Sequence, residues 1–217
     1  AFSVIGGYIS GMRAKLNKSL VIIKEMSIRD ELTGAYNRRH IMEQLEIERQ
    51  RVSRGGARFA IAMLDIDHFK SVNDTLGHLA GDEILRGTSD VIRNNLRSVD
   101  LYGRFGGEEF LIIMTQTDIE GAMLCAERVR GAVERKRFPR VGTDFRVTVS
   151  LGLTDYRGNE KIDAMIARAD KALYRAKDGG RNRLECDSGT YPEIEIDDSF
   201  LKYPREEMAN ENKGSNC

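Results

Sequence analysis

The sequence predicts an α/β fold, with a mixed β-sheet flanked by helices in an α+β sandwich. Three observations support this fold class. Strand-like apolar runs alternate with amphipathic helical segments along the chain. Two of these runs are joined by a Gly-Gly pair, which is typical of a β-hairpin. The 217 residues, 41% apolar and 31% charged, allow one globular domain with attached segments.

Residues 1–27 are expected to form an N-terminal helix. Seven positions are spaced alternately by four and three, which predicts a coiled-coil seam with one polar interruption. The alternative is an amphipathic helix that packs on its own domain. A second alternative is that the chain is a fragment cut beside a membrane anchor, because it begins with apolar residues and has no initiator Met. The seam positions are Ile5, Ile9, Met12, Leu16, Ser19, Ile23 and Met26.

The elements of the first half follow from periodicity and turn residues. We expect a helix at 37–52, a buried strand at 58–67 and a helix after Gly81. Two strands then flank Gly106-Gly107. Paired glycines indicate a hairpin here, because a tight primed turn needs positive φ at both positions.

The second half continues the alternation and ends in an acidic tail. A helix is expected from Asp118 to about residue 136, a strand at 145–154, a helix at 162–180 and a short strand at 183–186. The tail at 187–217 is expected to be an exposed extension or a linker. The chain thus divides into segments 1–27, 28–186 and 187–217.

Charge and cysteine content exclude several classes of protein. Lys+Arg and Asp+Glu both total 34, so the net charge gives no sign of nucleic-acid binding. The cysteines at 125, 186 and 217 are odd in number and lack metal-ligand spacing, which favours a reducing compartment. No run approaches the roughly 20 apolar residues of a membrane span. We therefore expect a cytoplasmic domain, or one on the cytoplasmic side of a membrane-anchored protein.

Two pairs of acids follow apolar strands. Asp65 and Asp67 end the buried strand, and their spacing of two places them on one side of the sheet. Glu108 and Glu109 follow the Gly-Gly turn, where a hairpin tip can lie beside that strand end. Clustered carboxylates suit Mg²⁺. Solvated strand-end acids are the competing interpretation, and the two are about equally favoured.

Basic residues offer candidate phosphate contacts, since the sequence has no GxxxxGK[ST] loop. Lys171 and Arg175 lie at i and i+4 on one helical face, where like charges repel unless an anion lies between them. Lys70 follows the first acidic pair. Taken alone, these residues are more often a solvated basic face.

Six blocks between residues 28 and 185 resemble, in order, the motifs of the GGDEF family. Gly106-Gly107-Glu108-Glu109-Phe110 is similar to the GG[DE]EF motif that names it. The resemblance implies a nucleotidyl-cyclase-like palm domain with a ferredoxin-related central sheet. The other blocks are DELTGAYNRR (30–39), DIDHFKSVND (65–74), GHLAGDEIL (77–85), VSLGLT (149–154) and ADKALYRAKDGGRN (169–182).

The resemblance also implies roles for individual residues. Asp65, the Ile66 carbonyl and Glu108 match the metal ligands, and Glu109 would bind metal or prepare the attacking 3′-hydroxyl. Two Mg²⁺ or Mn²⁺ ions per GTP are implied. Lys70 would steady charge that develops during transfer.

Substrate contacts follow in the same way. Asn73 and Asp82 resemble the guanine-reading pair, since a carboxylate accepts both N1–H and N2–H of guanine. Phe69 belongs to the substrate-binding block, beside His68, where relatives commonly have an aromatic residue. The remaining substrate-binding candidates are the backbone of Gly106 and Gly107, which would approach the phosphates, and the side chains of Lys171 and Arg175.

The implied activity is that of a diguanylate cyclase. Two GTP molecules would give cyclic di-GMP and two pyrophosphates, as each 3′-hydroxyl attacks the α-phosphate of the other GTP. Each domain would bind one GTP, so a homodimer formed through the N-terminal helix and an upstream sensor domain are expected. The Arg97–Asp100 stretch resembles the RxxD product-inhibition motif, and Arg128 its secondary arginine. Cyclic di-GMP would therefore be both product and inhibitor.

Two alternatives remain. A catalytically silent GGDEF domain would act as a receptor for GTP or cyclic di-GMP. A structural dimerisation module would retain the site only as a vestige. The intact GGEEF motif and phosphate-binding cations disfavour both.

Overall fold

The computed structural model describes residues 28–158 and 160–187. The expected helix at 1–27 and nearly all of the tail at 187–217 lie outside the described residues. No helix within the described ranges is long and apolar enough to cross a membrane. In chain order the elements are α2 (Arg38–Ser53), β1 (Phe59–Ile66), α3 (Phe69–Leu76), α4 (His78–Asn95), β2 (Leu101–Gly106), β3 (Glu109–Thr115), α5 (Ile119–Arg135), β4 (Val149–Asp155), α6 (Ile162–Asp178) and β5 (Leu184–Cys186).

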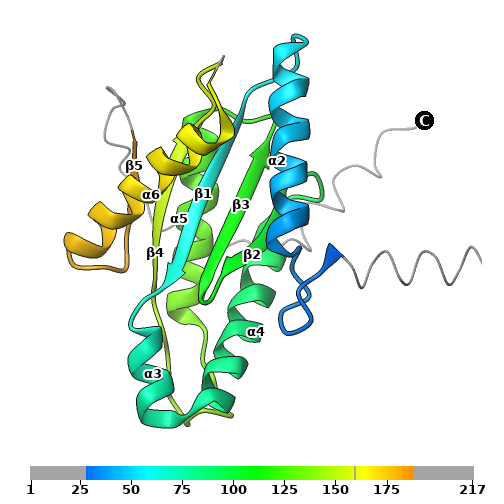
Figure 1. Ribbon diagram of the computed structural model, residues 1–217. Coiled ribbons are helices and arrows are strands. Elements are labelled where there is room, and N and C mark those ends of the chain that lie inside the picture. The colour runs from blue at the N-terminus through cyan, green and yellow to red at the C-terminus, as the bar shows by residue number, and fades with distance from the viewer. Residues whose placement is uncertain (1–27, 159, 188–217) are drawn as a thin grey trace, which may run out of the picture.

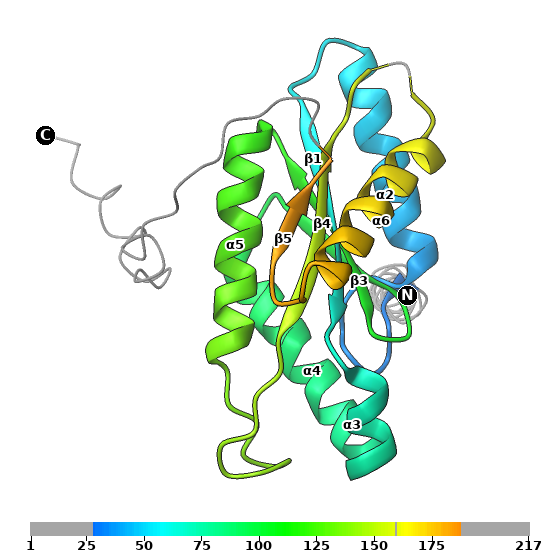
Figure 2. The same cartoon turned by 90° about the vertical axis from the view of Figure 1, so that its left-hand side faces the viewer.

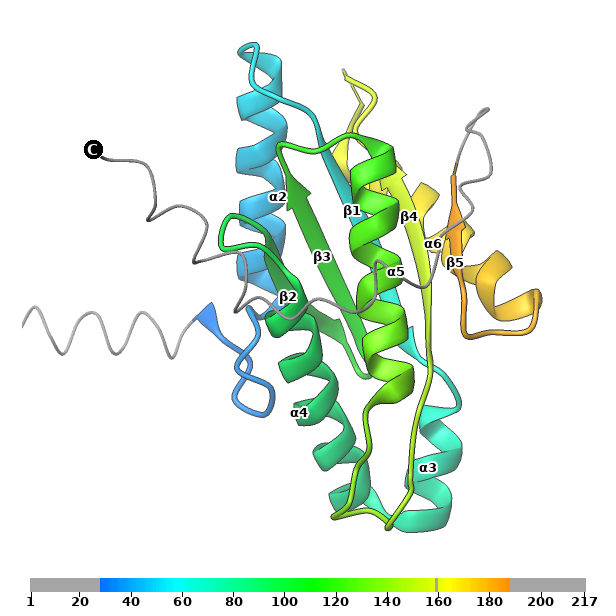
Figure 3. The same cartoon turned by 180° about the vertical axis from the view of Figure 1, so that it is seen from behind.

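The strands form one five-stranded mixed sheet in the order β2-β3-β1-β4-β5. β1 is central and pairs antiparallel with both β3 and β4, whereas β4 and β5 are parallel. Helices α2 and α6 cover one face of the sheet (Figure 1). Helices α4 and α5 cover the other face (Figures 2 and 3). The expected mixed sheet between two helical layers is confirmed.

Alternation along β1 divides the core between the two faces. Ala60, Ala62 and Leu64 belong to the cluster beneath α4 and α5. Phe59, Ile61 and Met63 belong to the cluster beneath α2 and α6. All eight residues of β1 are buried, as expected for a central strand covered on both sides.

Helix α6 lies directly against β4. An added Cβ at Gly152 would overlap the backbone of Ala169 and of Leu173. Glycine is therefore needed at this position because two backbones approach each other closely. The contact fixes the distance between α6 and the sheet.

The structure corrects several details of the expected elements. An additional helix, α3, precedes α4, and α4 begins at His78 instead of after Gly81. The residue between the two helices, Gly77, has φ +83. The strand expected at 145–154 begins later, at Val149, and is β4.

The hairpin is confirmed, but its turn is not the expected one. Of the two glycines only Gly107 has positive φ, at +28°. The turn consists of Gly107 and Glu108, because Gly106 is still paired with Glu109 in the β2–β3 ladder. A register shift between Arg104 and Gly106 accommodates this offset.

Candidate active site

Acidic side chains meet where β1 ends and β3 begins. Asp65 and Glu109 are directly opposed in the antiparallel register, so both project from the same face of the sheet. Asp65 is only 6% exposed. Glu108 lies in the hairpin turn, close enough for its charge to act on both neighbours. Three of the four predicted acids are thus brought together.

A lysine from α6 reaches this acidic group. Lys177 Nζ lies 2.7 Å from Asp65 Oδ2, and its side chain is 33% exposed. A charge-assisted hydrogen bond of this kind is stronger where water is largely excluded. Lys177 is not among the residues predicted for the site, although it lies within the ADKALYRAKDGGRN block.

Burial raises the pKa values of the carboxyl groups around Lys177. It raises the pKa of the Asp65 carboxyl, with opposition from Lys177 and reinforcement from Glu108. It also raises the pKa of Glu109, to which the charge of Asp65 contributes further. The pKa of Asp170 on α6 is raised by burial and lowered by Lys177. This partly dehydrated group therefore has an excess of negative charge that a bound cation would relieve.

Asp67, the fourth acid, has a different role from the one predicted. Its carboxylate accepts hydrogen bonds from Thr148 Oγ1 and Ser150 Oγ, both at 2.7 Å. It also accepts from the Asn182 backbone N–H at 3.1 Å. These three donors satisfy most of its acceptor capacity. Asp67 therefore fastens β1 to β4 and to the loop after α6, while its charge adds to the raised pKa of Asp65.

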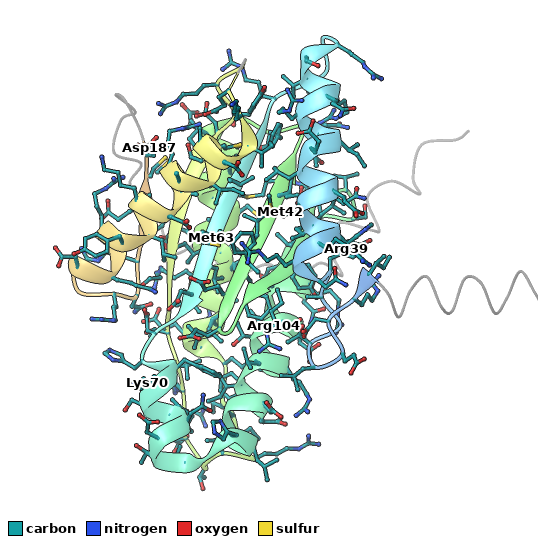
Figure 4. All side chains as sticks on the ribbon, in the orientation of Figure 1. Arg39, Met42, Met63, Lys70, Arg104 and Asp187 are labelled. Carbon is teal, nitrogen blue, oxygen red and sulfur yellow. The ribbon has the colours of Figure 1, made fainter. Side chains whose placement is uncertain are left out.

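The hairpin turn is fastened to the segment before α2. Arg104 Nε donates to the Gly107 carbonyl at 2.9 Å, and Arg104 Nη1 lies 3.2 Å from Asp30 Oδ2. Asp30 in turn accepts from the backbone N–H and hydroxyl of Thr33. Figure 4 shows Arg104 beside this segment. The turn that carries Glu108 is therefore held by an ion pair and not by the strand ladder alone.

Helices α3 and α4 carry the predicted guanine-reading residues on neighbouring turns. Asn73 packs so closely on Gly81 that an added Cβ there would overlap the Asn73 carboxamide. Asp82 follows Gly81 and is half-buried, with Arg86 Nη2 at 3.8 Å from its Oδ2. The structure thus brings Asn73 and Asp82 to the same part of the helix pair.

The predicted residues at the start of α3 are divided between core and surface. Phe69 is 7% exposed and belongs to the core cluster, so its ring packs in the core. Lys70 is exposed at the beginning of α3, near the end of β1 (Figure 4). His68, in left-handed conformation with φ 58, precedes this helix.

The structure does not bring Lys171 and Arg175 to the acidic group. Arg175 Nη2 donates to the Cys186 carbonyl of β5 at 3.0 Å, and Lys171 is exposed. On a helix with 3.6 residues per turn, these two positions lie about 120° or more around the axis from Lys177. Lys177 is therefore the α6 cation placed at the carboxylates.

The sequence of this domain matches a known protein family. The family model described as "Diguanylate cyclase, GGDEF domain" matches residues 27–183. The chain belongs to this family. The matched range covers strands β1 to β4, helices α2 to α6 and the acidic group, and it ends directly before β5.

Curated relatives support the same assignment. Diguanylate cyclase DgcP of Pseudomonas aeruginosa is 44% identical over 162 residues, which are 75% of this chain and 24% of that protein. Response regulator PleD of Caulobacter vibrioides is 39% identical over 180 residues, 82% of this chain and 39% of that protein. The chain thus spans about a quarter to two fifths of the length of these relatives.

Solved structures confirm the expected fold. Diguanylate cyclase SiaD of Pseudomonas aeruginosa, in complex with its activator SiaC, has a TM-score of 0.74 at 42% identity, covering 83% of this chain and 70% of that one. The coiled coil and GGDEF domain of DgcB from Caulobacter crescentus, in complex with c-di-GMP, has a TM-score of 0.77 at 30% identity. The match covers 82% of this chain and 94% of that one.

The predicted inhibitory residues of the GGDEF domain gather where α4 ends and β2 begins. Arg128 Nη2 donates to the Asn95 carbonyl at 2.7 Å, two residues before Arg97. The Asp100 carboxylate accepts from the backbone N–H of Arg97 at 3.0 Å and of Thr115 at 3.2 Å. Asp100 therefore shapes the turn, whereas the Arg97 side chain is exposed.

The acidic group of the GGDEF domain offers oxygen ligands of the kind that Mg²⁺ prefers. Within the described residues, no three His, Cys, Asp or Glu side chains converge closely enough to hold an ion by themselves. Mg²⁺, however, commonly binds one or two carboxylates together with water and substrate phosphates. Asp65, with its raised pKa, fits such a site, as do Glu108 and the strand-end carbonyl of Ile66.

Proposed function

We propose that the chain is a diguanylate cyclase that condenses two GTP molecules into cyclic di-GMP and two pyrophosphates. The observation that carries the proposal is the opposed Asp65–Glu109 pair with Lys177 beside it, within a GGDEF domain. In each of two steps, a bond forms between a 3′-oxygen and an α-phosphorus. The bond from that phosphorus to the β-phosphate oxygen breaks, and pyrophosphate leaves.

Glu109 is the proposed acceptor of the 3′-hydroxyl proton. Its pKa is raised by burial and by Asp65, which brings a carboxylate closer to the basicity that proton transfer needs. Asp65, Glu108 and the Ile66 carbonyl would hold Mg²⁺ or Mn²⁺, proposed at two ions per GTP. These ions would neutralise triphosphate charge and polarise the α-phosphate.

Other residues would bind and orient GTP. Asn73 and Asp82 are proposed to read the guanine edge, and the backbone at Gly106, Gly107 and Phe69 to approach the phosphates. Lys171 and Arg175 remain the proposed contacts to the terminal phosphates. Lys177 is proposed as a further α6 contact to the triphosphate, since its ammonium lies at the carboxylates. Lys70 would offset negative charge that develops during transfer.

The reaction requires two GTP-loaded domains that face each other, because each supplies one nucleotide. A homodimer is therefore part of the proposal, with the helix at 1–27 as its contact and a sensor domain upstream. Product inhibition through Arg97, Asp100 and Arg128 also belongs to it. The complexes of related GGDEF domains with c-di-GMP support a nucleotide of this class.

The proposal is tested by incubating the purified chain with GTP and Mg²⁺ at low and high protein concentration, with chromatography of the nucleotides. We expect cyclic di-GMP at a rate that rises more steeply than linearly with protein. Glu109→Gln should fold normally but lose turnover, because the amide neither accepts the proton nor carries charge. GTP or cyclic di-GMP bound without turnover would instead favour a receptor.

A further inference from the structure

Asn182, in the loop between α6 and β5, connects three parts of the fold. Its Nδ2 donates to Glu134 Oε1 at 2.8 Å, and its Oδ1 accepts from Arg130 Nη1 at 2.8 Å. Its backbone N–H donates to Asp67 Oδ2 at 3.1 Å, one residue beyond β1. A single residue therefore joins α5, the end of β1 and the loop after α6.

The α5 partners of Asn182 are themselves held in place. Arg130 Nε lies 2.7 Å from Glu127 Oε2, and Arg130 Nη1 lies 3.1 Å from Glu134 Oε2. The Arg130 side chain is only 18% exposed. The hydrogen bond from Asn182 is the largest cause of the lowered pKa of Glu134. Because donors and acceptors are matched, the network offers Asn182 a rigid anchor.

The backbone of this loop adopts an uncommon conformation. Gly180, Arg181 and Asn182 have φ values of +112°, +64° and +47°. Asparagine tolerates the left-handed region better than arginine does, and such strain persists only where surrounding contacts over-determine it. The clamp on α5 supplies such contacts.

The loop conformation also determines how α6 ends. The Arg181 N–H donates to the Ala176 carbonyl at 2.9 Å, and the Gly179 N–H donates to the Arg175 carbonyl at 2.8 Å. Lys177 lies within this last turn of α6 and places its ammonium on Asp65. A displacement of the loop would therefore move Lys177 relative to the end of β1.

We propose that Asn182 is a positioning residue, which clamps the loop after α6 to α5 and to Asp67 and thereby holds Lys177 at Asp65. The inference deepens the proposed function, because it rests on that function for the part that Lys177 plays at the triphosphate. The geometric part, Asn182 holding the Lys177–Asp65 ion pair, is independent of the activity.

Three variants separate the clamp from the backbone conformation. Asn182→Gly removes the side-chain clamp but keeps a residue that adopts positive φ freely. Asn182→Ala removes the clamp and disfavours the left-handed backbone, so it is the variant more prone to misfolding. Asn94→Ala, at an exposed position of α4, is the matched control for loss of a surface asparagine.

The first readout is the Lys177 ammonium itself, observed by NMR in the nucleotide-free chain with ¹⁵N-labelled lysine. In the parent chain and in Asn94→Ala we expect a protected Lys177 NH₃⁺ signal, identified by its loss in Lys177→Ala. In Asn182→Gly the signal should disappear or lose its protection. A Lys177 signal that is unchanged in Asn182→Gly overturns the proposal, whatever the enzymatic activity of the chain.

The second readout is kinetic and uses a double-mutant cycle. Asn182→Gly should lower kcat about tenfold to a hundredfold, as expected for a displaced catalytic contact, while its melting temperature stays close to that of Asn94→Ala. In the Lys177→Ala background the same substitution should add little further loss, because the residue acts through Lys177. If Asn182→Gly lowers kcat by the same factor in the parent and in the Lys177→Ala background, Asn182 does not act through Lys177 and the proposal is refuted. If the parent chain lacks cyclase activity, the proposed function fails while the NMR test still decides this inference.

Discussion

Arg104 connects the β2–β3 hairpin to Asp30. One guanidinium nitrogen lies 3.2 Å from Asp30 Oδ2, and Nε donates to the Gly107 carbonyl at 2.9 Å. Asp30 lies close to the start of the described residues, in the segment that follows the expected N-terminal helix. A shift of that segment would thus be transmitted to the turn that carries Glu108.

Loss of this ion pair is expected to loosen the hairpin turn. Asp30→Asn keeps the size of the side chain and its acceptor for Thr33, but removes the charge that Arg104 requires. We expect turnover to fall about tenfold, in line with the cost of misplacing catalytic groups, with faster amide hydrogen exchange around Gly107. Arg93→Ala, which breaks the exposed pair with Asp90 on α4, is the control and should leave both measurements unchanged.

Lys177 and Arg175 should differ sharply in their effects. Lys177→Met retains most of the side-chain volume but removes the ammonium at Asp65, so turnover should fall about a hundredfold or more, as when a transition-state charge contact is lost. Arg175→Met removes the contact to Cys186 and should cost less than about tenfold, since its guanidinium lies away from the acids. Steady-state kinetics decide this, and equal losses would show that Arg175 contributes as much as Lys177 to turnover.

The raised carboxyl pKa values predict how stability depends on pH. A carboxyl whose pKa is higher in the folded state favours folding at low pH. That contribution is lost as pH rises from the unfolded value through the folded one. Asp170→Asn should therefore raise the melting temperature at pH 7 to 8, and the gain should vanish below about pH 4. Thermal unfolding across this range is the measurement, and a gain that persisted at low pH would contradict the burial effect.

Divalent ions should stabilise the folded chain by binding to the acids where β1 ends and β3 begins. Mg²⁺ is expected to raise the melting temperature of the parent chain at pH 7.5, because a cation relieves the crowding of Asp65, Glu108 and Glu109. Asp65→Asn should abolish this shift. Glu120→Gln, at an exposed position on α5, should leave it intact. A shift of equal size in all three chains would indicate ion binding elsewhere.

Product inhibition is best tested at Arg97 and not at Asp100. The Arg97 side chain is exposed, so Arg97→Ala should relieve inhibition by cyclic di-GMP with little change in the uninhibited rate. Asp100→Ala would leave two backbone N–H groups without their acceptor and should also lower stability, by about 1 to 2 kcal/mol. Inhibition curves together with melting temperatures separate the two effects. Unaltered inhibition in Arg97→Ala would exclude the proposed site.

The elements were predictable wherever periodicity and turn residues agree. Helix α2 was expected at 37–52 and is observed at Arg38–Ser53, with the Asn37 side chain capping its first turn. Helix α3 was missed because eight residues are too few to show a clear helical period beside a longer neighbour. The expected turn was displaced because one of its glycines remains in the ladder.

The candidate site was predictable for residues close together in sequence, and less so for distant ones. The acids of β1 and of the hairpin could be brought together because strand ends and turns are local signals. The role of Asp67 depends on hydroxyl groups of Thr148 and Ser150, and that of Lys177 on Asp65, each far away in the chain. Such pairings arise from the packing of α6 and β4 on β1, which no local spacing records.

Gly152 gives this packing an electrostatic consequence. Since the backbones of α6 and β4 approach closely at Gly152, the height of the helix above the sheet also affects the separation between the Lys177 ammonium and the Asp65 carboxylate. The absence of one methyl group, on a strand that carries none of the proposed catalytic residues, thereby influences how the Lys177 ammonium and a bound metal ion would compete for the Asp65 carboxylate oxygens.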